Sequence, residues 1–388
     1  MCRQAAILTF QAESGLTYPP GHPFRPERSE MLLGILRRAG VLDEPWHSVR
    51  EVMPATREEL LAFHDESYLD LIDRADRGEI DLDLLEHGLG TEDCPAFFGV
   101  ARLAYLAAGA SLAGARLIAE GTAHLAFNPV GGFHHAGPAN AEGFCYVNDV
   151  VLACRELAGR GLRVACVDLD VHHGNGTEDG LLGDPRVLKV STHQDGRTLY
   201  PWRGEETVIG AGSAAGRNVN VPLPPGTDDP AFERVLRKVV LPVLETFGTD
   251  VVVLEIGMDV LAGDPLAGLR LTNNAMAEAA ALIRDLGRPV LVLGGGGYDP
   301  PRTARGWALC WGTLCGLANE DEYLGAVGGV LLGTHESSGL GSLREMHCFA
   351  QGDERACVDA EVDRVIAFHE ATTLPLLRGL GDRPGDHP

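Results

Sequence analysis

The segment Val164–Gly176 (VACVDLDVHHGNG) places acidic and histidine side chains within an apolar run, and this combination constrains the fold most strongly. The apolar residues are typical of a parallel strand that is covered on both faces. Asp168, Asp170 and His172 interrupt the run at every second position, so a strand that continued through them would point all three side chains to one side. Because two carboxylates are costly to bury together without a cation, the segment predicts a strand that leads into a metal site. A structural cation site without catalysis is the alternative.

The composition sets outer bounds on the protein. The 388 residues are 45% hydrophobic, which is enough for a large core built as one α/β domain or as two domains. Apolar runs such as Val251–Ile256 are too short to cross a membrane, and the N-terminus lacks the layout of a signal peptide. Nine cysteines without a CxxC pair predict reduced thiols and a cytoplasmic location.

The net charge of −23 argues against general binding to nucleic acid, whose phosphates are also negative. It favours cationic partners, such as lysine-rich peptides or polyamines. The composition leaves the oligomeric state open, with a homo-oligomer among the alternatives.

Strand-like runs alternate with helix-like runs through most of the chain, which favours one parallel sheet wrapped by helices. Strands are predicted at Ala5–Phe10, Ala123–Phe127, Val164–Val171, Val187–Ser191, Val251–Ile256 and Val290–Leu293. Helix starts are predicted at Pro26 or Glu27, at Pro95, at Asp229–Pro230 and after Thr272–Asn273.

Polar side chains directly follow four of these strands, and in parallel sheets ligands bind at the carboxyl ends of the strands. The residues are, in chain order, His134 and His135, then Asp170 and His172, then Asp259, then Tyr298. Taken singly, the histidine pair is consistent with a surface position, and Asp259 with a helix cap. The glycines at 294–297 match no phosphate-loop pattern and predict a tight turn. Taken together, these residues favour metal chemistry at one edge of the sheet.

The chain resembles the arginase–deacetylase superfamily, and within it the zinc-dependent histone deacetylases and their bacterial relatives, including acetoin-utilisation proteins. The matching segments are HPFRPER (22–28), EDCP (92–95), GGFHHA (131–136), GFCYVND (143–149), DLDVHHGNG (168–176), GMDVLAGDPL (257–266) and GGGGY (294–298). The resemblance implies a single α/β domain over residues 1–388, with an open, mostly parallel eight-stranded sheet flanked by helices and an active-site tunnel. The motifs occupy about residues 20–300, and a C-terminal helical segment covers about 318–388. Its apolar stretch Val362–Leu377 is expected to pack on the domain or on a partner subunit.

Carried over to this chain, the family pattern places a catalytic zinc ion, or iron in its place, on Asp170, His172 and Asp259. These ligands leave coordination positions open, as a catalytic site requires. Of the two neighbouring histidines, the resemblance implies His135 as general base and acid, with His134 in electrostatic support. Tyr298 would donate a hydrogen bond to the developing oxyanion.

The resemblance also implies residues around this centre. Asp168 matches the aspartate that orients His134, and a structural potassium ion is expected on Asp168, Asp170, His172, Ser191 and Thr192. Asn175 stands where many relatives carry an aspartate facing the second histidine. This departure should leave His135 less basic without abolishing activity.

The tunnel positions carry the prediction of substrate. Phe144 and Tyr200 match aromatic residues that flank an acyl-lysine stem, and Gly143 keeps one wall thin. Asp93 matches a rim aspartate that binds the substrate backbone, and Arg28 an arginine beneath the metal. Leu266 matches a rim position that is apolar in lysine deacetylases, whereas polyamine-specific members can carry a glutamate there.

Glu255 in VVVLEIGMD has the same strand parity as Asp259, so it is expected to point to the metal side but two steps deeper, at a position where many relatives have an uncharged residue. It is expected to pair with a base such as Arg28 or with backbone groups. The alternative is that it charges the channel floor and so restricts the length of the acyl group.

The resulting hypothesis is a metal-dependent amidohydrolase that removes acetyl or other short acyl groups from lysine side chains of proteins or peptides. In an acetoin-utilisation setting, the protein substrate would be one such as an acyl-CoA synthetase. Alternatives are an acetylpolyamine amidohydrolase, another small-amine deacetylase, or a non-catalytic acyl-lysine binding protein. A ureohydrolase is disfavoured because the ligands for a second manganese ion are too few.

Overall fold

An eight-stranded, all-parallel sheet in the order β2-β1-β3-β8-β7-β4-β5-β6 forms the centre of the protein. The computed structural model describes residues 4–9, 16–317 and 343–381. The strands are β1 Ala5–Thr9, β2 His47–Glu51, β3 Leu125–Asn128, β4 Val164–Asp168, β5 Val187–Gln194, β6 Asn218–Leu223, β7 Val251–Glu255 and β8 Val290–Leu293. The predicted α/β class with one open sheet is confirmed, and every strand pair is parallel.

Six of the eight strands were expected from their apolar runs, and β8 has the predicted bounds. Phe10, the last residue of the first predicted strand, lies outside the described residues. The strands without a prediction are β2 and β6, which lie at the two edges of the sheet. β2 carries polar residues (HSVRE), and β6 contains two asparagines and a proline (NVNVPL), so neither shows a plain apolar run.

The predicted strand Val164–Val171 is too long, because β4 ends at Asp168. Beyond it, the Asp170 backbone N–H donates to Asp168 Oδ1 at 3.1 Å, and the His172 N–H donates to Asp170 Oδ1 at 2.9 Å. Aspartate side-chain oxygens thus accept hydrogen bonds from backbone N–H groups that, in a strand, would donate to the neighbouring strand. The chain therefore turns here. Asp170 and His172 therefore lie in a loop, and strand alternation was the wrong reason to group them with Asp168.

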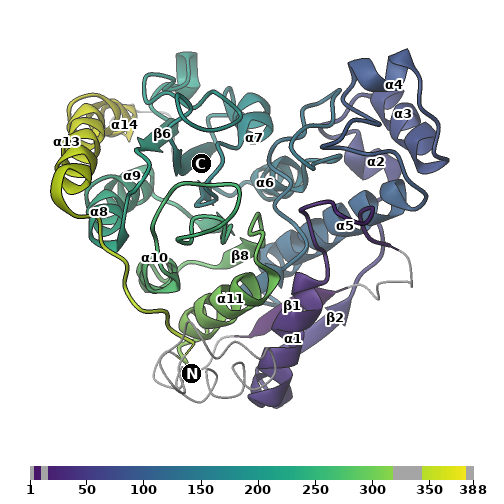
Figure 1. Cartoon of the computed structure of the whole chain (residues 1–388), viewed down its shortest axis with the longest axis horizontal. Coiled ribbons are helices and arrows are strands. Elements are labelled where there is room, and N and C mark those ends of the chain that lie inside the picture. The colour runs from purple at the N-terminus through teal and green to yellow at the C-terminus, as the bar shows by residue number, and fades with distance from the viewer. Residues whose placement is uncertain (1–3, 10–15, 318–342, 382–388) are drawn as a thin grey trace.

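Helices cover both faces of the sheet (Figure 1). One face packs α5 (Val100–Ala119) and α6 (Asp149–Gly159) against strand residues such as Ala126 and Cys166. The other face packs α1, α8, α9, α10 and α11 against residues such as Phe127 and Val167. Successive strand residues point to opposite faces, and both faces are apolar, as expected for a parallel sheet.

The remaining helix bounds show how well the predicted starts agree with the structure. The bounds are α1 Arg28–Arg38, α2 Arg57–Leu60, α3 Glu66–Asp76, α4 Leu82–Glu86, α7 Asn175–Leu181, α8 Asp229–Val235, α9 Leu241–Phe247, α10 Asn273–Asp285 and α11 Pro300–Leu314. Thr272 caps α10 as predicted. The helix expected from Pro95 begins only at Val100, because the left-handed Gly99 at φ 94° precedes it.

The C-terminal helices α13 (Gly352–Phe368) and α14 (Leu374–Gly381) pack on the domain beside α8, α9 and β6 (Figure 1). Val362, Val365 and Ile366 are buried there. Of the predicted C-terminal segment, residues 318–342 and 382–388 lie outside the described part of the chain. Among the helices that the structure describes, none has both the length and the apolar character needed to cross a bilayer.

Candidate active site

The four strands that carry the predicted site, β3, β8, β7 and β4, are neighbours in the middle of the sheet. Because they are all parallel, the loops that follow them leave the sheet on one side. The histidine pair follows β3, Tyr298 follows β8, Asp259 follows β7, and Asp170 and His172 follow β4. The fold therefore brings these residues to one edge.

Asp170, His172 and Asp259 form a buried cluster with the chemistry of a metal site. One ligand atom from each lies within 4.8 Å of the others. His172 Nδ1 is 3.3 Å from Asp170 Oδ1 and 3.1 Å from Asp259 Oδ2. Two carboxylates and one imidazole are suitable ligands for a divalent cation.

Electrostatics favour a positive charge in this cluster. Burial alone would lower the pKa of His172, but hydrogen bonds to Asp170 and Asp259 outweigh it and raise that pKa to about 10. Burial and the neighbouring Asp170 raise the pKa of Asp259 to about 7. Without an ion, a proton on His172 thus supplies the positive charge that the carboxylates need, and a divalent cation fits the same place.

Glycines allow the backbone to approach this cluster closely. A Cβ atom at Gly296 would lie 2.1 Å from Asp259 Oδ2, and one at Gly257 would lie 2.1 Å from Asp170 Oδ2. The Gly296 N–H also donates to Asp170 Oδ2 at 2.6 Å. The glycine run that predicted a tight turn is therefore a wall of this candidate metal site.

His134 and His135 are both buried, and their Nε2 atoms lie 3.2 Å apart. His134 Nδ1 is 2.9 Å from Asp168 Oδ2, whereas His135 Nδ1 is 2.7 Å from Asn175 Oδ1. Burial would lower the pKa of His134, but the charges of Asp168 and Asp170 reverse this and raise it. Burial and the neighbouring histidines lower the pKa of His135 well below its ordinary value.

The loop that holds this pair depends on two polar residues of the GFCYVND segment for which the sequence predicted no role. Asp149, fully buried, accepts hydrogen bonds from the backbone N–H groups of Gly132 and Phe133. Asn148 donates to the backbone carbonyl of His134 at 3.3 Å and also caps α6. Their position inside a recognised motif was the available signal.

Tyr298 is held by Asp264, another residue that sequence reasoning missed. Asp264 accepts from the Tyr298 backbone N–H at 2.9 Å and from the Leu266 N–H at 3.0 Å, which joins the rim position to the tyrosine. Burial and the charge of Asp259 raise the pKa of Tyr298 well above its usual range, so the hydroxyl keeps its proton. The signal available in the sequence was the aspartate of AGDP, five residues after Asp259.

Arg28 is buried against the glycine run at 294–297. Its guanidinium donates to the backbone carbonyls of Gly297 at 2.7 Å and Gly295 at 2.9 Å. The same group stacks over Phe24 and Trp307, at 4.7 and 4.9 Å from the ring centroids. Arg28 therefore supports the glycine run and makes no ion pair with Glu255.

Glu255 lies against His134 instead. Its Oε1 is 3.1 Å from His134 Nδ1, and neither carboxyl oxygen has a hydrogen-bond partner among the residues that the structure describes. Burial, together with Asp168 and Asp170, raises the pKa of Glu255 well above its ordinary value. The expectation that it pairs with Arg28 or with backbone groups was wrong, because the β7–β4 register sets Glu255 beside Asp168.

Phe144, Gly143 and Tyr200 surround the histidines and Tyr298. The Phe144 ring packs edge-on against Tyr298 at 5.8 Å, and Tyr200 packs against His135 at 5.1 Å. A Cβ atom at Gly143 would lie 2.3 Å from the His135 ring. Gly143 must therefore remain a glycine, which agrees with the thin wall expected there.

Asp93 is exposed, and its backbone carbonyl is 3.1 Å from His22 Nε2. The His22 ring packs edge-on against Phe144, which ties the Asp93 loop to the aromatic residues beside Tyr298. Asp93 and Leu266 thus connect to the site through their backbone groups.

Ser191 and Thr192 lie on β5, next to the strand that leads into the Asp170 loop. The strand register sets Ser191 beside Asp168, and Thr192 Oγ1 is buried without a hydrogen-bond partner in the described part of the chain. The Ser191 hydroxyl lies 2.9 Å from His193 Nδ1. The segment therefore brings oxygen atoms close to the Asp168 loop.

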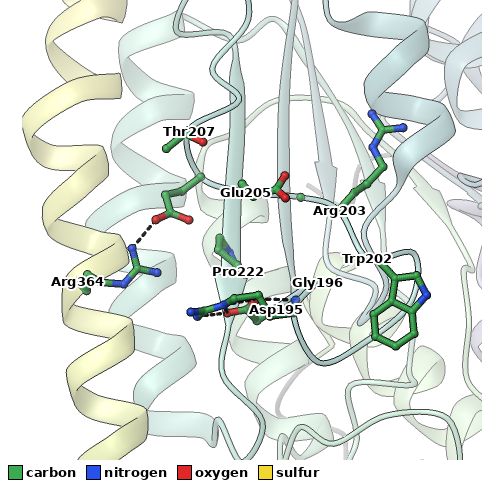
Figure 2. Close-up of a pocket in the computed structure, with 11 residues that line it drawn as sticks. Asp195, Gly196, Trp202, Arg203, Glu205, Thr207, Pro222 and Arg364 are labelled. Carbon is green, nitrogen blue, oxygen red and sulfur yellow. Dashed lines mark hydrogen bonds and ion pairs between the residues drawn. The ribbon is translucent and has the colours of Figure 1, made fainter.

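The loop 195–207, which carries Tyr200, borders a surface pocket of about 430 Å³ (Figure 2). Three ion pairs lie around it: Arg197 with Asp195, Arg203 with Asp179 at 2.7 Å, and Arg364 of α13 with Glu206. Trp202 remains 65% exposed at its edge. The second and third of these pairs connect the loop to α7 and α13.

Comparison with known proteins gives one consistent result. The histone deacetylase domain model matches residues 22–314. Histone deacetylase 8 of Xenopus tropicalis is 36% identical over 301 residues, which cover 76% of this chain and 80% of the relative. Histone deacetylase RPD3 of Saccharomyces cerevisiae is 34% identical over 300 residues, which cover 76% of this chain and 68% of the relative.

The solved structure of an HDAC homolog from Aquifex aeolicus superposes with a TM-score of 0.80 at 29% sequence identity, covering 94% of this chain and 100% of that one. The all-parallel sheet, the site at its edge and these similarities agree. The chain belongs to the histone deacetylase family, which supports a deacetylase function for it.

Proposed function

We propose that the protein is a zinc-dependent lysine deacylase that hydrolyses acetyl or other short acyl groups from lysine side chains. The observation that carries the proposal is the convergence of three elements at one sheet edge. These are the metal-ligand cluster, the histidine pair with opposite pKa shifts, and a tyrosine that keeps its proton. This set matches the requirements of metal-assisted amide hydrolysis.

Asp170, His172 and Asp259 would hold the ion. A divalent cation bound there supplies Lewis-acid polarisation of the acyl carbonyl and a more acidic water. Its burial among carboxylates, and the raised pKa of His172, support a strong preference for a cation at this place.

The histidines then divide the proton transfers. His135, whose pKa is lowered, is neutral and accepts the proton of the attacking water, which it later delivers to the leaving amine. His134, whose pKa is raised by Asp168, remains charged and stabilises the negative charge that develops nearby. Tyr298 donates a hydrogen bond from its hydroxyl group to the oxyanion. The products are a free amine and a carboxylate.

The channel supports a lysine side chain as the group that enters. Phe144 and Tyr200 offer aromatic surface beside the catalytic groups, which suits an aliphatic stem. The rim position Leu266 is apolar, and it offers no carboxylate to bind the distal ammonium of a polyamine. Asp93 is placed at the exposed mouth, where it can accept hydrogen bonds from a peptide backbone.

We also propose that a monovalent cation, potassium by preference, binds beside the Asp168 loop. The side chain of Ser191, the unpaired hydroxyl of Thr192 and the backbone of Asp168, Asp170 and His172 offer oxygen atoms there. Such an ion would fix the loop that carries the metal ligands.

The test compares an acetyl-lysine peptide with N-acetylputrescine and N-acetylspermidine as substrates of metal-free protein reloaded with Zn²⁺ or with Fe²⁺. Tyr298→Phe is the control, because it removes one hydroxyl and keeps the ring. We expect turnover of the peptide with Zn²⁺ and a loss of at least 100-fold in kcat for the variant, as for removal of an oxyanion donor.

Turnover of the polyamines alone would overturn the lysine assignment. Binding of the acetylated peptide without turnover, in wild type and variant alike, would indicate a recognition protein instead of an enzyme.

A further inference from the structure

Glu142 links the general base to the channel wall. Its Oε1 accepts a hydrogen bond from the Tyr200 hydroxyl at 2.8 Å, and its Oε2 accepts one from Asn175 Nδ2 at 3.1 Å. Asn175 Oδ1 in turn lies 2.7 Å from His135 Nδ1. A carboxylate, an amide and an imidazole are thus connected in series.

The carboxylate fixes the orientation of the amide. An ionised Glu142 only accepts hydrogen bonds, so Asn175 must turn its NH₂ group towards Glu142 and its carbonyl oxygen towards His135. That oxygen also only accepts, and His135 therefore carries its proton on Nδ1. The lone pair then remains on Nε2, which is the atom that a base at this position needs.

The series also replaces a group that the chain lacks. A direct carboxylate partner raises the basicity of a histidine, and Asn175 by itself is neutral. Hydrogen bonds in a chain polarise one another, so donation to Glu142 makes Asn175 Oδ1 a stronger acceptor for His135. The charge of Glu142 thus acts on His135 indirectly, through Asn175.

The backbone of Glu142 belongs to the same wall. Glu142 and Cys145 exchange backbone hydrogen bonds at 3.0 and 2.9 Å around a turn in which Gly143 and Phe144 have φ of 52° and 69°. The Tyr18 hydroxyl holds the strained turn by donating to the Phe144 carbonyl at 2.6 Å. One turn therefore presents Phe144 to the channel and Glu142 to Tyr200.

We propose that Glu142 is a positioning residue for the deacylation reaction, which sets the tautomer of His135 through Asn175 and holds the Tyr200 wall through its second oxygen. The inference rests on the proposed function and deepens it.

The first test is a double-mutant cycle in the zinc-loaded protein. Glu142→Gln is expected to lower kcat by about tenfold in the wild-type background, because it removes the charge and keeps the shape. In an Asn175→Asp background, where a carboxylate faces His135 directly, the same change is expected to cause no loss, since it relieves the repulsion between two carboxylates. A loss of equal size in both backgrounds, or in neither, overturns the proposal.

The second test does not depend on turnover. In protein labelled with ¹⁵N-histidine, His135 is assigned by the loss of its signals in His135→Gln. We expect the Nδ1-protonated tautomer in the wild type and a mixture of tautomers in Glu142→Ala. An unchanged tautomer refutes the role of Glu142, while a shift without any acetyl-lysine hydrolysis by the wild type would leave this role standing and refute the proposed function.

Tyr200→Phe separates the hydrogen bond of Glu142 Oε1 from those of Oε2, which accepts from Asn175 and, at 3.4 Å, from Asn140. It removes the bond to the channel wall only, so we expect KM for the acetyl-lysine peptide to rise several-fold while the His135 tautomer stays unchanged. A tautomer shift in Tyr200→Phe would contradict the assignment of separate roles to the two oxygens.

Discussion

His134 and His135 are adjacent in the chain and almost equally buried, yet they lie in different surroundings. Nδ1 of His134 faces the carboxyl groups of Asp168 and Glu255, while Nδ1 of His135 faces the amide of Asn175. The pKa of His134 is raised and that of His135 is lowered, and burial acts to lower both. Since burial is shared, the comparison teaches that neighbouring charges decide which histidine stays neutral and can serve as a base.

Replacing each histidine with alanine is expected to give the largest difference in kcat between the two positions. We expect His135→Ala to lower kcat for an acetyl-lysine peptide by about 10²–10⁴-fold, the range for loss of a general acid–base group. His134→Ala should lower kcat less, because its charge assists the reaction without carrying the proton. Steady-state kinetics of both zinc-loaded variants check this, and a larger loss in His134→Ala would reverse the assignment.

Replacing the carboxylate beside His134 should bring the pKa of His134 closer to that of His135. Asp168→Asn is expected to lower kcat by about 10–100-fold, as for other partners that orient a histidine, because the imidazole loses the charge that stabilises its protonated form. Rates with acetyl-lysine at saturating concentration provide the measurement.

Glu255→Gln is the matched control for that change. Burial raises the pKa of Glu255 well above its ordinary value and so favours the neutral form, which Gln resembles, and we therefore expect the replacement to change kcat by less than about threefold. The ratio of rates on acetyl-, butyryl- and longer acyl-lysine should also stay the same. A changed ratio would instead support the hypothesis that Glu255 limits the length of the acyl group.

His64 is a reference for the histidine pair, because it is buried without a carboxylate beside it. Its replacement is expected to have the smallest effect of the changes considered, on stability alone. Its Nε2 accepts from the Asn148 backbone N–H at 3.0 Å, beneath the loop of the histidine pair, and burial lowers its pKa to about 4. The unfolded chain protonates this residue below about pH 6.5, whereas the folded chain does so only near pH 4. The contribution of neutral, buried His64 to the free energy of unfolding is therefore fully present above pH 6.5, and it is lost as the pH falls from 6.5 towards 4.

Between pH 7 and pH 5, His64→Gln should reduce the pH-dependent loss of stability by on the order of 1–2 kcal/mol, with kcat at neutral pH unchanged. Urea unfolding at several pH values provides the measurement. His87→Gln, at a partly exposed position, is the control, and an equal reduction in both variants would contradict the explanation by burial.

Much of the fold follows from local patterns in the sequence. The central strands β7 and β8 are runs of branched apolar residues, and the segments Asp229–Pro230 and Thr272–Asn273 mark helix starts, although the residue that caps α8 is Asp228. The edge strands β2 and β6 lack this signal for different reasons: β2 is largely exposed, whereas β6 is buried throughout and its two asparagines donate hydrogen bonds to Glu178. Their pairing is decided by partners far away in the sequence.

The site was predictable where residues follow strands and unpredictable where two distant segments meet. Asp259 and Tyr298 could be grouped because parallel strands share an edge. The contact of Glu142 with Asn175 joins positions 33 residues apart across two loops, and no periodicity links them. Glu255 was expected to meet Arg28, but the β7–β4 register, which the sequence does not encode locally, sets it beside Asp168 instead.

The C-terminal helices have a consequence for association between chains. β6 is an outermost strand, and such a strand can pair with an identical strand of another molecule. Here α13 packs along β6, and His369 Nε2, buried between α13 and α14, hydrogen-bonds to the Asn220 carbonyl of β6 at 2.8 Å. The C-terminal helices thus cover the edge strand. A chain shortened before residue 352 would expose the edge of β6 to pairing with β6 of another molecule.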